Sequence, residues 1–333
     1  MTMDADGKGK GATYLDGISR ALRDEMRSDP AVFCLGEDIG VYGGAFRVTK
    51  GLLEEFGEER VLDTPLAESA IIGASIGAAL MGMRPVAEMQ FADFVACGFN
   101  QLVNFAAKVH YRWGAKCPMT LRLPTGGGVH GGPFHSSNME GWFFHVPGLK
   151  IVAPSTPADA YGLLRSAIRD DNPVLYFEHK FLYRRVRGEI PAGDGIVPIG
   201  LAARARPGTD AVVVTYGAMV HAAMDAAALI ARDDGAQVEV IDLRSLLPWD
   251  RGAVLEAARR TNRVMVLHEA TRTGGVGAEI SAVIMEEAFE ALDAPVARLA
   301  SLDTPVPYSP PLEAAFMPDV PKIVDGLRRL LSY

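Results

Sequence analysis

Glu68 is the first residue whose surroundings suit catalysis. It stands at the start of the apolar run ESAIIGASIGAAL, at positions 68–80. A carboxylate in the first turn of a helix is stabilised by the helix dipole, and this is the ordinary explanation for such a residue. Because the residues around Glu68 are apolar, we expect it to be buried, where a raised pKa would let it hold or share a proton near neutral pH.

His135 is the second candidate, because it lies in a loop made largely of glycine. The stretch PTGGGVHGGPFHSSN covers positions 124–138 and has five glycines within positions 126–132. Glycine has no side chain to bury, so such a loop brings backbone close to a ligand or to a neighbouring chain. His135 is therefore a candidate acid or base. Three histidines fall between positions 130 and 145, but their spacing fits no familiar metal site, and we expect His130 and His145 to be ordinary loop residues.

The segment that positions Glu68 has the pattern of a strand end followed by a helix. Thr64 and Pro65 suit an N-cap and a first helical turn, so we expect the helix to begin there. It is apolar nearly all round, which predicts burial. Ser69, Gly73 and Gly77 recur every four residues and form a small-residue face. Glycine weakens a helix interior by about 1 kcal/mol relative to alanine, so we expect the backbone of this face to lie very close to a neighbouring structure.

Strands and helices alternate along the chain, as in parallel sheets covered on both faces. The pattern predicts a long helix over residues 96–113 and strands near residues 31–36, 85–90, 119–123, 149–154 and 173–178. The alternation stops in a charged, Pro- and Gly-rich stretch and then restarts. We therefore predict an α/β fold with two doubly wound domains: a disordered tail at 1–11, a first domain with a largely parallel sheet at 12–185, a linker at 186–205 and a smaller domain at 206–333.

Composition narrows the class of protein. The 333 residues carry a formal net charge of −8, which gives no support to binding of nucleic acid or of an anionic membrane. The longest apolar run, residues 70–83, is too short to cross a bilayer. Three widely spaced cysteines without a CxxC pair fit a reducing compartment. The polar N-terminus does not have the pattern of a signal or transit peptide, so we expect a cytoplasmic, bacterial-type protein.

The sequence Gly193-Asp194-Gly195 looks like the start of the magnesium motif of thiamine-diphosphate enzymes, but its context is wrong. That motif places GDG at a strand end and an Asn some way downstream, whereas this GDG lies in the linker and no Asn occurs from 196 to 261. No GxxxxGK[ST] loop and no GxGxxG after a strand is present either. We expect the chain to have no phosphate-binding motif of its own.

Several stretches together resemble the β subunit of the thiamine-diphosphate-dependent 2-oxo acid dehydrogenase (E1) components, of the branched-chain 2-oxo acid, pyruvate and acetoin types. They are DTPLAES, GMRPVAEMQFADF, RLPTGGGVHGGPFHS, AIRDDNPVLYFE, QVEVIDLRSLLPWD and HEATRTGGVGAEI, and the likeness extends over about residues 12 to 333. The resemblance implies a pyrimidine-binding domain, a transketolase-like C-terminal domain, and an α2β2 heterotetramer whose α subunit holds Mg²⁺ and the cofactor's diphosphate.

The resemblance also implies a reaction: oxidative decarboxylation of a 2-oxo acid, followed by transfer of the acyl group to a lipoyl group of an E2 acyltransferase docked on the C-terminal domain. Glu68 matches the family's carboxylate at the pyrimidine N1′ of thiamine diphosphate. Phe94 matches a position, often Tyr in relatives, that packs on the pyrimidine. His135 matches the histidine that serves proton transfer during acyl transfer, although HSSNMEGWFF here departs from the common HSQSPEA.

A structural K⁺ is implied for some members of the family, held mainly by backbone carbonyls. The matching segments are residues 119–120 and 167–172, with Met119, Ala167, Ile168, Asp170 and Asn172 as candidate ligands. Three interpretations therefore stand: an E1 β subunit for a branched-chain 2-oxo acid or pyruvate, an acetoin dehydrogenase β subunit, and a non-catalytic interaction subunit of the same fold. Glu68, Phe94 and His135 together argue against the last.

Overall fold

The computed structural model describes residues 11–333, which divide into two compact units. The first unit comprises the described residues up to 125 together with 142–199, and the second comprises 126–141 together with 200–333. The glycine-rich loop therefore belongs by its contacts to the second unit, although its sequence interrupts the first. The domain boundaries at 12–185 and 206–333 remain our proposal from the sequence, and the expected tail lies outside the described residues except for Gly11.

The core of the first unit is a parallel sheet with its strands in the order β6-β7-β5-β4-β2-β3. Strands β5 and β7 are buried along their whole length, as expected for central strands covered on both faces. The bounds are β2 (Val32–Gly36), β3 (Val61–Asp63), β4 (Arg84–Glu88), β5 (Thr120–Thr125), β6 (Lys150–Val152) and β7 (Val174–His179). A short pair, β1 (Ala12–Thr13) and β8 (Arg187–Gly188), is antiparallel.

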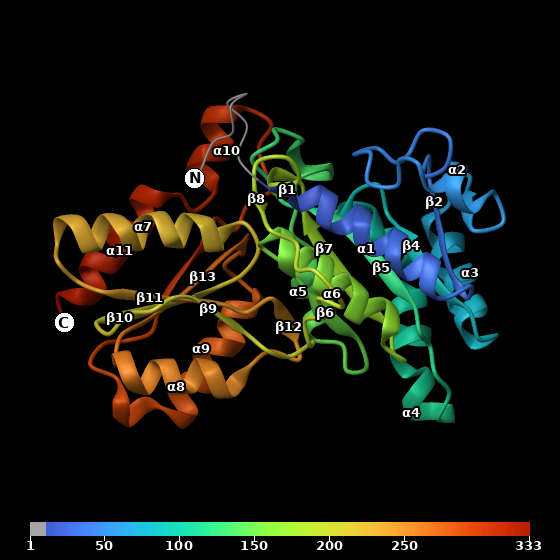
Figure 1. Ribbon diagram of the computed structural model, residues 1–333. Helices are drawn as coiled ribbons and strands as arrows, with labels where there is room; N and C mark the ends of the chain where they lie inside the picture. Colours follow the sequence, from blue (N-terminus) through green and yellow to red (C-terminus); the bar gives the residue numbers. More distant parts are fainter. Residues whose placement is uncertain (1–10) are drawn as a thin grey trace. The chain divides into compact units, whose positions relative to one another are not determined.

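Helices cover the sheet of the first unit. Helix α1 (Tyr14–Ser28) begins with a capping box between Thr13 and Asp16 and lies along α6 (Pro157–Arg169) (Figure 1). Helix α3 (Glu68–Leu80) packs against β4 and against the 3₁₀ segment η1 (Ala92–Gly98). The remaining helices are α2 (Leu52–Phe56), α4 (Val109–Trp113) and α5 (Glu140–Phe144).

The long helix expected over residues 96–113 is not a regular α-helix. The segment runs as η1, a π-helical turn η2 (Gln101–Phe105), a 3₁₀ turn η3 (Ala106–Lys108) and α4. The irregular part includes Gly98, where an added Cβ would lie 2.2 Å from Ile72 Cδ1 of α3. Such departures from α geometry are common where a helix is held against functional or closely packed neighbours.

The second unit is built on a sheet with the order β14-β13-β10-β11-β9, parallel except for β9 at one edge. Helices α7 and α11 cover one face, and α8 and α9 cover the other (Figure 1). The strands are β9 (Ala203–Arg206), β10 (Ala211–Thr215), β11 (Val238–Asp242), β13 (Val264–Thr271) and β14 (Ala297–Ser301). The helices are α7 (Met219–Asp233), α8 (Arg251–Thr261), α9 (Val276–Glu287), α10 (Pro310–Phe316) and α11 (Val320–Leu331).

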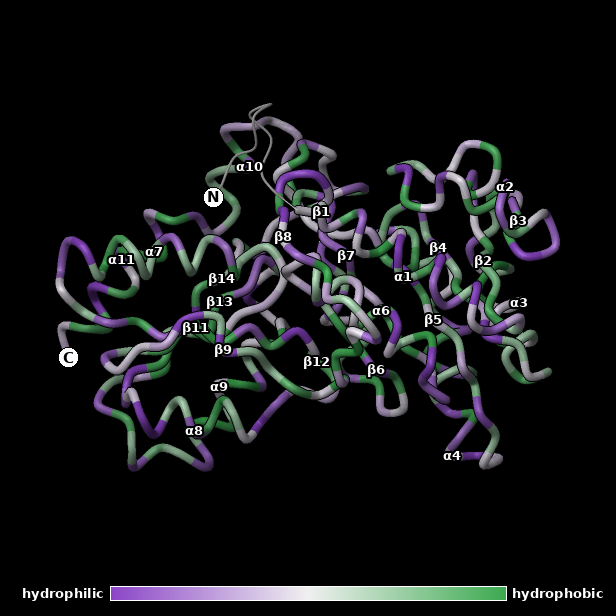
Figure 2. The backbone as a smooth tube through the Cα atoms, viewed as in Figure 1, coloured by the Kyte–Doolittle hydropathy of each residue, from purple (hydrophilic) through white to green (hydrophobic). Residues whose placement is uncertain are grey.

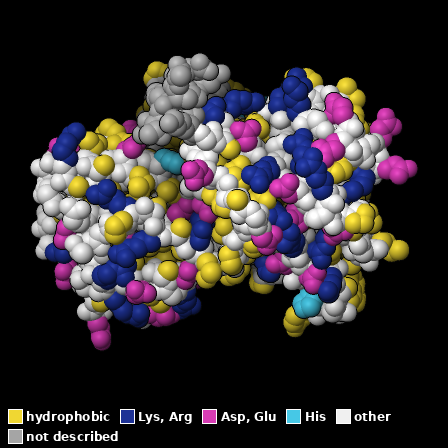
Figure 3. All heavy atoms as spheres, in the orientation of Figure 1, with side chains coloured by type: hydrophobic (Ala, Val, Ile, Leu, Met, Phe, Trp, Pro, Cys, Tyr) yellow, Lys and Arg dark blue, Asp and Glu magenta, His cyan; other side chains and the backbone are white. Residues whose placement is uncertain are grey.

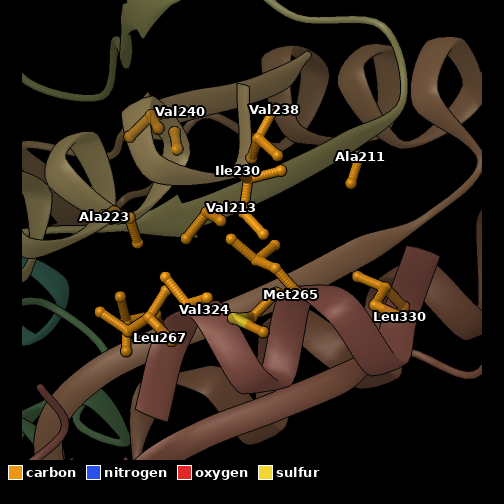
Figure 4. Close-up of a cluster of buried hydrophobic side chains, with 14 of the residues drawn as sticks. Ala211, Val213, Ala223, Ile230, Val238, Val240, Met265, Leu267, Val324 and Leu330 are labelled. Atoms are coloured by element: carbon orange, nitrogen blue, oxygen red, sulfur yellow. The ribbon is translucent and has the colours of Figure 1, made fainter. Parts of the chain in front are cut away.

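Apolar side chains fill the space between this sheet and its helices. Val213, Val240 and Met265 of the strands meet Ile230 of α7 and Leu330 of α11 (Figure 4). Figure 2 shows purple and green segments along α7 and α11, as expected for helices with one buried face. The expected fold class, α/β with two sheet-based units, is confirmed.

Charged side chains of both signs are interspersed on the face shown in Figure 3. This face does not have the basic stripe typical of nucleic-acid-binding proteins. Within residues 11–333, no helix combines the length and apolar character needed to cross a membrane.

Candidate functional site

The strand register of the first unit aligns polar residues at one edge of the sheet. Gly36 of β2 lies opposite both Asp63 of β3 and Glu88 of β4, and Glu88 lies opposite Arg122 of β5. These are the carboxyl ends of parallel strands, where open α/β sheets bind their ligands. The candidate site is therefore the edge from which the chain continues into Glu37, Glu68 and Phe94.

Glu68 is the first residue of α3, at the positive end of the helix dipole. The helix starts later than expected, because Ala67 rather than Thr64 is its N-cap. The Thr64 N–H donates instead to the Gly36 carbonyl at 3.0 Å, which prolongs the contact between β3 and β2. Glu68 itself is half-buried in the single chain.

The expectation that α3 is buried all round is wrong for this chain. One face is buried, and it consists of Ile71, Ile72, Ser75, Ile76 and Ala79. The small-residue face is open: Gly73 is half-buried and Gly77 is exposed, and a Cβ added to either would meet nothing within 4 Å. The apolar sequence around the helix is explained only in part by the packing of the first unit, which reaches one side of it.

Glu37 is a site residue that the sequence analysis did not select. It directly follows β2 and is only 3% exposed. Its pKa is raised, first by burial and then by the negative charge of Glu68, while the backbone of Ala67 acts in the opposite direction. Two carboxylates held near each other favour sharing one proton. The available signal was the position of Glu37 immediately after a buried strand.

Phe94 lies in η1, the segment that packs against α3. Its ring meets Phe91 edge-on with centroids 5.7 Å apart, and Phe91 meets Phe46 in the same manner at 5.4 Å. The Lys180 ammonium lies 5.6 Å from the centre of the Phe91 ring. The structure thus brings Glu68 and Phe94 onto adjoining elements, with an aromatic cluster behind Phe94 that fixes its surroundings.

A buried ionic cluster lies next along the same edge. The Arg122 guanidinium, 1% exposed, bonds the Glu88 carboxylate and donates to Glu178 Oε2 at 3.1 Å. The Tyr183 hydroxyl donates to Glu178 Oε1 at 2.6 Å. Burial raises the pKa of Glu88 although Arg122 opposes the shift, and it raises the pKa of the Tyr183 hydroxyl strongly. Each charge in this cluster has an oppositely charged or hydrogen-bonding partner.

His135 belongs to the second unit, whereas Glu68 belongs to the first. It follows a 3₁₀ turn, η4 (Gly132–Phe134), is half-buried, and donates its N–H to the Gly132 carbonyl at 3.3 Å. Its neighbour Ser136 is buried and accepts from the Gly131 N–H at 3.2 Å. His130 is exposed and contacts Glu313, and His145 is exposed.

Within 11–333, no three His, Cys, Asp or Glu side chains are grouped so as to hold a metal ion. Asp194 of the Gly193-Asp194-Gly195 sequence pairs with Arg165 and Arg169, with N–O distances of 3.1 Å and 3.3 Å. Asp194 therefore forms its ion pairs within the first unit.

The candidate potassium ligands gather around the C-terminal end of α6. The Arg84 guanidinium donates to the carbonyls of Ile168 at 2.9 Å and Asp170 at 3.1 Å. Other backbone N–H groups donate to the carbonyls of Met119 and Ala167, and the Asn172 N–H donates to the Asp170 carboxylate. Two of the carbonyls expected to bind K⁺ therefore already face a cationic side chain of this chain, so the residues do not form a free ring of carbonyl ligands.

Comparisons with known proteins agree with this architecture. Residues 10–186 match the family model "Transketolase, pyrimidine binding domain", and residues 200–323 match "Transketolase, C-terminal domain". The solved structure "Split gene transketolase, inactive beta4 tetramer" superposes with a TM-score of 0.79 at 22% identity, covering 97% of this chain and 99% of that one. At that identity the match shows the fold alone.

Curated relatives are more similar in sequence. The 2-oxoisovalerate dehydrogenase subunit beta of Bacillus subtilis is 50% identical, over 96% of this chain and 99% of its own length. The pyruvate dehydrogenase E1 component subunit beta of the same organism is 43% identical, over 96% and 99%. The acetoin:2,6-dichlorophenolindophenol oxidoreductase subunit beta of Cupriavidus necator is 44% identical, over 95% and 96%. The chain therefore belongs to the transketolase-like family of 2-oxo acid dehydrogenase E1 β subunits.

Proposed function

We propose that this chain is the β subunit of a thiamine-diphosphate-dependent E1 enzyme, which oxidatively decarboxylates a 2-oxo acid and acylates a lipoyl group of an E2 partner. The observation that carries the proposal is the position of Glu68: a half-buried carboxylate at a helix N-terminus, at the carboxyl edge of a parallel sheet, beside a second carboxylate with a raised pKa. Family membership supplies the class of reaction.

The residues at this edge fit an aminopyrimidine ring. Glu68 would accept and return a proton at the ring nitrogen N1′, a role that a carboxylate can fill and an amide cannot. Phe94 offers an aromatic surface against the flat ring, held in place by Phe91. When bound, thiamine diphosphate supplies the electron sink for decarboxylation. The buried negative charge of Glu37 favours keeping a proton within the pair that it forms with Glu68.

We assign His135 to the second half of the reaction, the transfer of the acyl group to lipoyl. Its place in a loop built of glycine and serine leaves the ring half-buried, so that it can meet a substrate. The C-terminal unit would be the surface on which E2 docks. Both assignments rest on the family resemblance and on the exposure of the ring.

The proposed partner is an E1 α subunit, in an α2β2 assembly, which would also hold Mg²⁺ and the cofactor's diphosphate. The relatives are named as beta subunits. The open small-residue face of α3 is where we place a close subunit contact, because glycine at positions 73 and 77 leaves space there for a neighbouring backbone. Its exposure in the single chain supports this assignment over an internal structural role.

The fold is shared by enzymes with different substrates, so the substrate is proposed from the sequence relatives. We propose a branched-chain 2-oxo acid or pyruvate, since one relative is named for 2-oxoisovalerate and another for pyruvate, and both are at least 43% identical to the chain. Acetoin is the second candidate, supported by the Cupriavidus relative. One methylene in an apolar pocket discriminates by only about 1–3 kcal/mol, so sequence likeness at this level separates the three poorly.

The decisive assay is reduction of an artificial electron acceptor by this chain mixed with its α subunit, thiamine diphosphate and Mg²⁺. Pyruvate, 3-methyl-2-oxobutanoate and acetoin are tested in parallel, with Glu58→Gln, at an exposed glutamate, as the matched control for Glu68→Gln. Turnover that requires the α subunit and Glu68 supports the proposal. Absence of turnover with all three substrates in a stable α–β complex would favour the non-catalytic interaction subunit.

Potassium stays outside the proposed reaction, because Arg84 already occupies two of the candidate carbonyls. A melting comparison in KCl and NaCl at equal ionic strength tests for the ion: stabilisation in KCl alone would support a site near Asp170. For location we propose the cytoplasm, on the basis of the three free cysteines, two of which are buried. Fractionation with compartment markers tests that assignment.

A further inference from the structure

The glycine-rich loop is tied to the second unit by two buried glutamates that the sequence motifs do not include. Glu269 lies in β13 and is 5% exposed, and Glu313 lies in α10 and is 2% exposed. Buried carboxylates require partners. Both accept hydrogen bonds from the loop, from two backbone N–H groups and two side chains.

Glu269 joins the two ends of the loop. A single oxygen, Oε1, accepts the Gly127 N–H at 2.6 Å and the Asn138 Nδ2–H at 3.0 Å. Residues 127 and 138 flank the segment that carries His135, so this carboxylate closes the loop at its base. Charge-assisted hydrogen bonds of this kind are shorter and stronger than neutral ones.

Glu313 binds the N-terminal part of the loop. Its Oε1 accepts the Gly128 N–H at 2.9 Å, and its Oε2 lies 2.5 Å from Nδ1 of the exposed His130. Since a carboxylate only accepts, the His130 ring nitrogen is the donor in this contact. Two adjacent backbone N–H groups, at positions 127 and 128, therefore point at two different buried carboxylates.

The glycines are explained by this close approach. A Cβ at Gly127 would lie 2.7 Å from Met317 Sδ and 3.2 Å from Glu313 Oε1, and a Cβ at Gly132 would lie 2.2 Å from the Tyr308 ring. Gly128 and Gly132 also have φ values of +74° and +69°, which favour glycine. The interpretation of the loop as a backbone approach to an external ligand is thus replaced, at these positions, by an approach to the protein's own C-terminal unit.

We infer that Glu269 and Glu313 are positioning residues that fix the 127–138 loop, and with it His135, on the C-terminal unit. The part that concerns His135 rests on the proposed function, in which His135 serves acyl transfer. Neither glutamate contacts a substrate in this role. Each acts by holding backbone, and the effect on the reaction is confined to the step in which His135 takes part.

Hydrogen exchange measured by mass spectrometry in the full α–β complex tests the anchoring directly. In Glu313→Ala we expect at least tenfold faster exchange in peptides covering 127–138, with unchanged exchange in β10 and β11. Glu313→Gln keeps an oxygen for the Gly128 N–H and should retain most of the protection, whereas Glu290→Ala, at an exposed glutamate of the same unit, should change nothing. Unchanged exchange of the loop in Glu313→Ala would overturn the inference.

Kinetics separate anchoring from general damage. Acyl transfer to a free lipoyl domain should fall at least tenfold in Glu313→Ala and recover in Glu313→Gln, while reduction of an artificial acceptor stays within about twofold of wild type. If Glu313→Ala fails to fold, His130→Asn removes only the exposed partner of Glu313, and Asn tolerates the positive φ of position 130. His130→Asn should also slow acyl transfer, by less than Glu313→Ala, and leave reduction of the artificial acceptor nearly unchanged. Acyl transfer at the wild-type rate in His130→Asn would count against the inference.

His135→Ala distinguishes the two possible failures. If His135→Ala transfers acyl groups normally, the proposed role of His135 is wrong, and faster loop exchange in Glu313→Ala still supports anchoring. If His135→Ala is impaired and Glu313→Ala loosens the loop without slowing transfer, positioning by Glu313 is wrong and the proposed function stands.

Discussion

Two sets of carboxylates lie at the same edge of the first unit's sheet, and they differ in whether a positive charge balances them. Glu88 and Glu178 share the guanidinium of Arg122, and Tyr183 donates a further hydrogen bond. After burial, the largest effect that raises the pKa of Glu37 is the negative charge of another carboxylate, that of Glu68. The first set is compensated; the second is a like-charge pair.

This difference indicates what each set contributes. A buried ion pair with all partners present stabilises the relative placement of the strands that carry it, and removing one partner is costly. Carboxylates that repel each other cost stability, and they are found where a proton must be held or moved. The carboxylates at this edge therefore separate into a structural cluster and a chemical one.

Glu68→Gln should produce the largest effect. The amide keeps the shape and a hydrogen bond but cannot transfer a proton, so we expect turnover in the α–β complex to fall by about 10²–10⁴. The melting temperature should stay near that of wild type, because Glu68 is half-buried and forms no ion pair with the other described residues, 11–333. An equal loss of activity in Glu58→Gln would show that Glu68 has no specific role in proton transfer.

Arg122→Met should be the most damaging change to stability. It leaves Glu88 and Glu178 buried without their shared cation, and breaking such a pair costs about 3–5 kcal/mol. Urea unfolding of the isolated chain measures the loss. Arg112→Met, at an exposed arginine of α4, is the matched control. Wild-type stability in Arg122→Met would mean that the cluster is not the structural element we describe.

Glu37→Gln should increase the stability of the folded chain, in contrast to Arg122→Met. A raised pKa means that the native state binds a proton more tightly than the unfolded state, so the contribution of Glu37 to stability is lost as pH rises through the raised pKa. The amide removes that loss. We therefore expect Glu37→Gln to be more stable than wild type near pH 8, with a higher Tm.

The gain in Glu37→Gln should disappear below the ordinary pKa of 4.5, where the carboxyl group is protonated in both states. Turnover should nevertheless fall, by about tenfold or less, because the proton-holding pair is broken. Thermal melts from pH 4 to pH 8 and the acceptor assay give the two readouts. Lower stability at pH 8 would place Glu37 with the compensated set.

Phe94→Leu should give the smallest effect. Aromatic contacts contribute about 0.5–1.5 kcal/mol beyond the area that they bury, so the concentration of thiamine diphosphate needed for half-activation should rise by about two- to tenfold. Phe94→Tyr keeps the ring and serves as the control. Equal behaviour of the Leu and Tyr variants would show that the ring of Phe94 makes no contact with the cofactor.

The elements that carry the site could be predicted because local patterns specify them. The apolar run after Glu68 and the strand before Glu37 are visible as periodicity, and the motifs around Phe94 and His135 indicate the family. The start of α3 was misplaced, since Thr64 bonds Gly36 across the sheet instead of capping the helix. The helix over 96–113 was expected to be regular, but its packing against α3 decides otherwise.

The sequence by itself determined the fold class, the family and the two elements on which Glu68 and Phe94 lie. Only the tertiary structure decided that Glu37 stands beside Glu68, and that Glu269 and Glu313 hold the loop of His135. Those relations join residues far apart in the chain, such as Gly128 and Glu313. They depend on strand register and on which backbone N–H groups a buried carboxylate can reach. The local pattern of apolar and polar residues specifies neither of these.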